Sequence, residues 1–182
     1  MALSPQTLTE AERRVVAAWA ADCAERVLPL FEAEAPDDDG TRSGIERARA
    51  YARGELDTAT EIRNRFRSGR PAHAVSAPAA VAAARSAAQA AAVSHMGAHA
   101  LGAAAYAAKA AGLAAPDAGV ARVAELAWQL GRMSPAVRAA LAKLPALGSD
   151  AAGPLGPGLL TRGAPAESIR ALQAAIVDRG SD

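Results

Sequence analysis

The chain has 182 residues, with 20 basic and 19 acidic side chains and only 3% aromatic residues. This length suits one domain, or one domain with a tail, and the interspersed charges lack the basic footprint of a nucleic-acid-binding protein. Small aliphatic side chains must therefore form most of the core, and the single cysteine, Cys23, excludes an intrachain disulfide.

The first thirty residues predict an amphipathic helix. The N-terminal segment lacks the basic start and apolar run of a signal peptide, so we expect a cytoplasmic protein. Thr7 and Thr9 each precede a glutamate by three residues, which is the spacing of a capping box. Pro29 lacks an amide hydrogen and is expected to kink or end the helix near Phe31. The apolar residues at helical spacing are Val15, Val16, Trp19, Cys23, Val27 and Leu30.

An acidic loop at residues 36–40 separates this helix from two shorter ones. The loop resembles part of a calcium-binding loop, but Ala35 occupies the first ligand position, so we interpret the loop as a solvated turn. Ser43 is placed to cap a helix that Gly54 closes, and Asp57 or Thr58 to cap another that ends around residues 68–71. Four arginines near the end of that second helix, Arg63, Arg65, Arg67 and Arg70, form a local basic run.

More than half of residues 79–111 are alanine. They predict a long central helix that begins near Pro78 and ends at Gly112, with a break allowed around residues 94–97. The stretch also contains Arg85 and Gln89, and alanine is only weakly apolar, which argues against a membrane span.

The remaining sequence predicts helices separated by proline and glycine. Asp117 is placed to begin a helix that ends near Gly131, and Ser134 to cap another that ends near Lys143. Residues 145–165 are rich in glycine and proline, and residues 165–178 form a last amphipathic segment. We therefore predict an all-α fold: a multi-helix bundle of residues 1–145 around the Ala-rich helix, followed by a linker and C-terminal helix over residues 146–182.

Four side chains of the Ala-rich helix are candidates for chemistry. His95, His99, Tyr106 and Lys109 would fall on one side of a continuous helix. The two histidines have the i, i+4 spacing of metal ligands, but the sequence offers no clear third ligand, so we predict neither a metal nor another cofactor. The histidines either form structural hydrogen bonds or act as acid and base, with Tyr106 orienting a substrate and Lys109 binding it.

The first helix offers a second candidate site. Trp19, Cys23 and Arg26 lie within about 60° of one another, and Asp22 precedes Arg26 by one turn. Asp22 and Arg26 either form an ion pair that closes the core, or Arg26 anchors an anionic ligand beside Trp19. Cys23 is interpreted as a small core residue and not as a nucleophile.

Several segments resemble a family of small, all-helical bacterial immunity proteins over residues 10–145. The matching segments are Trp19-x-x-Asp22-Cys23-Ala24-Glu25-Arg26-Val27-Leu28, Arg49-Ala50-Tyr51-Ala52-Arg53-Gly54-Glu55, Ser94-His95-Met96-x-x-His99-Ala100, Ala104-Ala105-Tyr106-Ala107 and Trp128-Gln129-Leu130. The resemblance implies an all-helical protein that binds and neutralises a toxin.

Two functions are therefore predicted, of which we favour the first. One is an immunity-like binding protein that associates stoichiometrically with a protein or small-molecule partner, through an exposed patch such as the arginine run or the terminal helix. The alternative is a small natural-product biosynthetic enzyme, or a subunit of an enzyme complex, that catalyses acid–base cyclisation or elimination at a histidine-lined pocket. Neither function involves nucleic acid or a membrane, and the oligomeric state cannot be read from the sequence.

Overall fold

The computed structural model describes residues 4–58 and 71–178. These residues form helices without strands, which confirms the predicted all-α class. The second short helix expected after Thr58 and the arginine run lie outside the described residues. The elements are η1 (Pro5–Thr7), α1 (Glu10–Glu32), α2 (Gly40–Ala52), η2 (Pro71–His73), α4 (Pro78–Ala92), α5 (His99–Leu113), α6 (Ala118–Gly131), α7 (Pro135–Leu141), η3 (Leu159–Thr161) and α8 (Gly163–Asp178).

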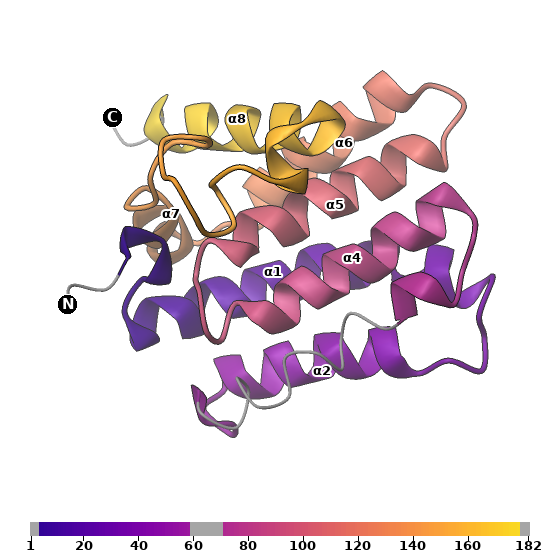
Figure 1. Cartoon of the computed structure of the whole chain (residues 1–182), viewed down its shortest axis with the longest axis horizontal. Coiled ribbons are helices and arrows are strands. Elements are labelled where there is room, and N and C mark those ends of the chain that lie inside the picture. Colours follow the sequence, from indigo (N-terminus) through magenta and orange to yellow (C-terminus); the bar gives the residue numbers. More distant parts are fainter. Residues whose placement is uncertain (1–3, 59–70, 179–182) are drawn as a thin grey trace.

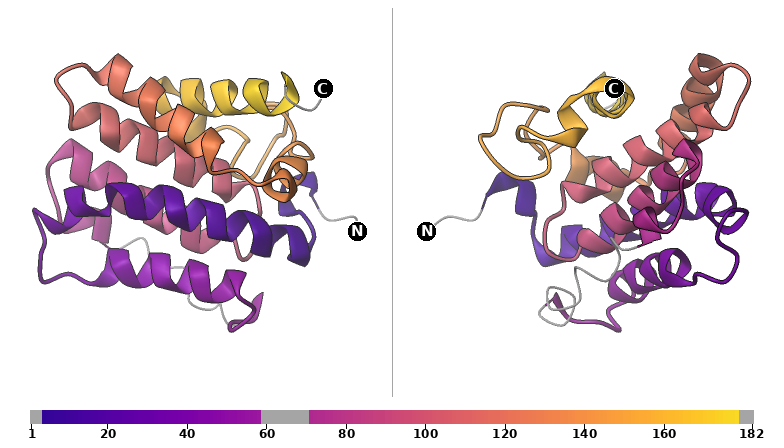
Figure 2. Two further views of the ribbon diagram at one scale, coloured as in Figure 1. Left: turned by 180° about the vertical axis from the view of Figure 1, so that it is seen from behind. Right: turned by 45° about the vertical axis from the view of Figure 1, so that its right-hand side comes forward.

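Helix α5 occupies the centre of the bundle. It contacts α1, α4, α6 and α8, while α2 lies at one edge and α8 at the opposite edge (Figure 1). The two further views show α6 on the outside of the bundle, next to α5 (Figure 2). Within the described residues, no helix is both long enough and apolar enough to cross a membrane.

Local sequence signals set the ends of several helices. Thr9 caps α1 through a complete capping box with Glu12, whereas the similarly spaced Thr7 belongs to η1. The helix ends at Glu32, three residues after Pro29, which agrees with the predicted effect of the proline. Asp117 and Ser134 cap α6 and α7 as predicted, each accepting a hydrogen bond from the amide three residues ahead.

The Ala-rich stretch folds into two packed helices, α4 and α5, and not into one long helix. The break lies over residues 93–98 and includes the region where a break was allowed. The turn is held by the N-terminal segment, because Gly97 N donates to Thr7 O and Ala98 N to Gln6 O, both at 3.0 Å. Folding back buries the small faces of the two helices against each other, and this burial favours the hairpin over one continuous helix.

The predicted linker is an ordered loop that the N-terminus holds in place. The buried Gln6 side chain donates to Asp150 Oδ2 at 2.6 Å and to Ala152 O at 2.7 Å, and it accepts from Leu155 N at 2.9 Å. Beyond this loop, α8 packs on α5 and buries Leu172 completely. The C-terminal segment therefore contributes to the same core as α5.

Replacing Gln6 by alanine is expected to loosen this loop. The change leaves three buried or partly buried polar groups without their partner, at a cost of about 1.5 kcal/mol in the free energy of unfolding. Denaturant unfolding measures this loss, and limited proteolysis should show faster cleavage within residues 148–156. An unchanged cleavage pattern would contradict a holding role for Gln6.

Candidate functional site

The two histidines meet at the turn between α4 and α5. His95 lies in the turn and His99 is the first residue of α5, with their ring centroids 5.0 Å apart. His99 Nδ1 lies 2.8 Å from Oε1 of Gln89 on α4. Because the helix is interrupted, His95 does not continue the helical stripe that contains His99 and Tyr106, which corrects the geometry expected from a continuous helix.

Tyr106 and Lys109 differ in their surroundings. Tyr106 is buried, and the Arg85 guanidinium lies 5.8 Å from its ring centroid. Lys109 is partly buried on α5 and lines neither of the two hollows described below. The predicted roles of these residues and of the histidine pair therefore stay predictions.

His99 is held in its neutral form. Burial, followed by the nearby His95, lowers the pKa of His99 from 6.5 to about 3. A base with so low a pKa accepts protons weakly at neutral pH. This property favours a hydrogen-bonding role for His99, whose Nδ1–H donates to Gln89 Oε1, over acid–base chemistry.

This pKa shift predicts that the protein loses stability as the pH falls below 6.5. Above pH 6.5 both the folded and the unfolded chain carry neutral His99, so its contribution is fully present. Between pH 6.5 and about 3 only the unfolded chain binds the proton, so stability decreases as the pH falls. Allowing for the partial exposure of the ring, we expect His99 to account for a loss of about 1 kcal/mol between pH 7 and pH 5.

Denaturant unfolding at both pH values tests this expectation. His99→Gln should reduce the loss, whereas His73→Gln, which changes an exposed histidine, should not. Equal pH dependence in the wild type and in His99→Gln would show that His99 titrates normally.

Arg26 forms its ion pair with Glu125 of α6 and not with Asp22, which corrects the pairing expected on α1. Arg26 Nε lies 2.6 Å from Glu125 Oε2, and the Glu125 side chain is only 4% exposed. Asp22 instead contacts Arg49 at 3.0 Å and Arg132 at 3.5 Å. Arg26 pairs with the buried Glu125 and not with Asp22, which is one turn away on α1, because burial strengthens the attraction between opposite charges.

A network of buried polar groups supports Glu125 from below. Gln129 is fully buried, and its Nε2 donates to Glu125 Oε1 at 3.2 Å and to Ala104 O at 3.0 Å. Trp19 is a core residue whose Nε1 donates to Gln129 O at 3.0 Å. The sequence placed Trp19 beside Arg26, but Glu125 and Gln129 were not predicted as site residues. The signal that could have found them is their i, i+4 spacing next to Trp128.

The surroundings of Cys23 disfavour a nucleophilic role. Its side chain is fully buried, and burial, together with the nearby Glu125 and Asp22 carboxylates, raises the pKa of the thiol well above its usual value. The thiolate that would be needed for nucleophilic attack is therefore disfavoured at neutral pH.

Above this network lies a surface group that we call the Arg26–Trp128 cluster: Asp22, Glu25, Arg26, Trp128 and Arg132. The Arg26 guanidinium lies 4.4 Å from the Trp128 ring centroid, and that of Arg132 lies 5.9 Å away. The five residues line a hollow of about 210 Å³. A second hollow of about 400 Å³ opens on the other side of Arg26, lined by Arg26, Val27, Pro29, Leu30, Ala111, Ala114 and Glu125.

Helix α6 continues this surface with an exposed apolar face. Val120 and Val123 are 67% and 66% exposed, and Ala124 and Ala127 are exposed beside them. These positions follow helical spacing and define the outer face of α6, which Trp128 borders. An exposed apolar face of this kind is typical of a surface that another molecule covers.

Comparison with family models decides the relationship of this chain to known proteins. Residues 6–136 match a family described as Imm-5 like putative immunity protein. The chain belongs to this family. The match confirms the resemblance found in the sequence, and it includes all residues of the Arg26–Trp128 cluster and of the outer face of α6. Comparison with curated proteins and with solved structures gives no match.

Family membership suggests an immunity-like function. The loop over residues 148–162 and helix α8 lie beyond the matched region. Residues 6–136 contain both the histidine pair and the Arg26–Trp128 cluster, so the family match favours neither of them as the functional site.

Proposed function

We propose that this member of the Imm-5 like family neutralises a protein toxin by stoichiometric association, through the Arg26–Trp128 cluster and the outer face of α6. The observation that carries the proposal is a partly exposed tryptophan, flanked by two arginines, beside an exposed apolar helix face.

This composition is that of a protein-binding surface. Tryptophan and arginine are the residue types that most often dominate binding energy, and interfaces place an apolar centre inside a polar rim. Trp128 and the outer face of α6 supply the apolar centre. Arg49, Asp22 and Glu25 form a linked set of charges next to it, since Arg49 contacts both carboxylates.

The other surfaces that the sequence suggested have less support. The arginine run lies outside the described residues, and α8 uses much of its apolar face to pack on α5. The alternative acid–base enzyme is weakened by the low pKa of His99, and no histidine lines either hollow beside Arg26.

A growth-protection assay tests the proposal. The chain is co-expressed with a candidate toxin domain that arrests growth, and the wild type should restore growth. Val123→Glu and Trp128→Ala should abolish protection, because a buried charge or a lost aromatic anchor weakens the interface.

The matched control is Val177→Glu, which places the same charge at an equally exposed valine (65%) on α8 and should protect like the wild type. Circular dichroism verifies that each variant folds. Full protection by Val123→Glu would contradict the proposed surface. Toxin neutralisation by much less than one equivalent of purified protein would contradict stoichiometric association.

A further inference from the structure

We infer that the hollow between Arg26 and the end of α5 receives a carboxylate side chain and a neighbouring apolar side chain from the toxin partner. The inference rests on the proposed function and specifies the chemistry that the partner presents. It concerns the hollow of about 400 Å³, which we call the Arg26 hollow. This volume lies within the range of about 300–1,000 Å³ that is usual for ligand pockets.

One side of the Arg26 hollow is apolar. Val27, Pro29 and Leu30 line it from the last turns of α1, and Ala111 and Ala114 from the end of α5. The alanines leave space that larger side chains would fill. An apolar side chain of the partner would gain free energy by leaving water here.

The other side presents a held arginine with unused donors. Arg26 Nε is committed to Glu125 Oε2, and the guanidinium carbon lies 4.4 Å from the Trp128 ring centroid. Within the described part of the chain, neither Nη nitrogen of Arg26 has a hydrogen-bond partner, and the side chain is 44% exposed. A guanidinium held in this way suits a carboxylate, which can accept two parallel hydrogen bonds.

The surrounding charges favour a single negative charge. Arg49 contacts the nearby carboxylates of Asp22 and Glu25, and Arg132 also contacts Asp22, so two arginines compensate these two acids. Glu125 lines the Arg26 hollow and neutralises part of the charge of Arg26. A doubly charged phosphate would therefore meet too little positive charge, whereas one carboxylate would find a partner.

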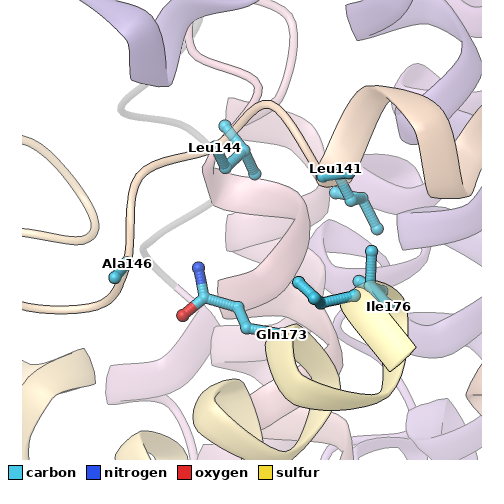
Figure 3. Close-up of a pocket in the computed structure, with 7 residues that line it drawn as sticks. Leu141, Leu144, Ala146, Gln173 and Ile176 are labelled. Atoms are coloured by element: carbon cyan, nitrogen blue, oxygen red, sulfur yellow. The ribbon is translucent and has the colours of Figure 1, made fainter. Parts of the chain in front are cut away.

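A third hollow of the molecule provides an internal reference for the Arg26 hollow. It lies between α7 and α8, has a volume of about 140 Å³, and is lined mainly by apolar side chains such as Leu141, Leu144 and Ile176 (Figure 3). Its polar lining residue, Gln173, is uncharged and donates to Pro145 O. A ligand that binds through its apolar part alone should therefore have no charge-dependent preference for the Arg26 hollow over this one.

The test is an NMR titration of the full chain with two peptides. The peptides are acetyl-Ala-Leu-Glu-Ala-amide and its glutamine counterpart, which differ only in the charge of one side chain. The glutamate peptide should shift the methyl signals of Val27 and Leu30 and the indole signal of Trp128, and it should bind about fivefold more tightly than the glutamine peptide. The methyl signals of Leu144 and Ile176 should stay in place.

The double variant Arg26→Gln/Glu125→Gln removes both charges without leaving either one unpaired, and it should bind the two peptides equally. Equal binding of the two peptides to the wild type would overturn the inference, as would shifts of the same size at Leu144 and Ile176. Octanoate serves as a third probe: if it binds at Arg26 while neither peptide does, the Arg26 hollow takes a free carboxylate and not a protein segment.

Failure of this inference can be distinguished from failure of the proposed function. If the double variant still protects cells from the toxin while Val123→Glu does not, the proposed function stands and the role of Arg26 is wrong. If neither variant loses protection, the proposed binding surface itself is wrong.

Discussion

Replacing Ala103 by leucine is expected to lower the free energy of unfolding by about 3 kcal/mol. Ala103 is fully buried on α5, and Ser86 Oγ of α4 donates to its carbonyl oxygen at 2.8 Å. This hydrogen bond shows how closely the two helix backbones approach. A leucine side chain must push α4 away from α5, because a close-packed core has no space for three additional carbon atoms.

Chemical denaturation followed by circular dichroism measures the effect. Ala174→Leu is the matched control, since Ala174 is exposed on α8, and it should change stability by less than about 0.5 kcal/mol. A similar loss in both variants would indicate that the approach of α4 and α5 is not what limits residue size at position 103.

Replacing Arg26 by alanine is expected to cost about 2 kcal/mol. The change leaves the carboxylate of Glu125, which is 4% exposed, without its ion-pair partner. The value lies below that of a fully buried pair, because Arg26 itself is 44% exposed and water can replace part of its interaction. Val27 and Trp128, which flank Arg26, should keep their places.

A double-mutant cycle with Arg26→Gln and Glu125→Gln measures the interaction between the two side chains separately from the effect of each substitution alone. Each single variant should be less stable than the double variant, because each leaves one charge unpaired. Thermal and denaturant unfolding of all four proteins gives the coupling energy. Additive effects of the two substitutions would show that Arg26 and Glu125 do not interact in solution.

The family match and the physical description of the surface concern different features of the protein. Family membership concerns residues 6–136 as a whole, whereas the Arg26–Trp128 cluster and the outer face of α6 are the surface through which we propose that a partner binds. The growth-protection assay and the peptide titration test these two levels separately.

The sequence by itself determined the helical class and several helix ends. Thr9 with Glu12, Asp117 and Ser134 act through hydrogen bonds to amides three residues away, and such local effects can be read from spacing. The family segments around Trp19, Arg26 and Trp128 lie on α1 and α6, and the allowed break at residues 94–97 lay within the turn.

Only the tertiary structure decided how these elements combine. The Ala-rich stretch folds back because two small-residue faces bury each other and the N-terminal segment bonds to the turn. Arg26 pairs with Glu125, which is 99 positions away in the sequence, and not with Asp22, which is one turn away. Gln6 forms hydrogen bonds to a loop that lies some 145 residues later. These interactions depend on which side chains are buried and on which helices pack together. The spacing of residues along the chain does not reveal either of these.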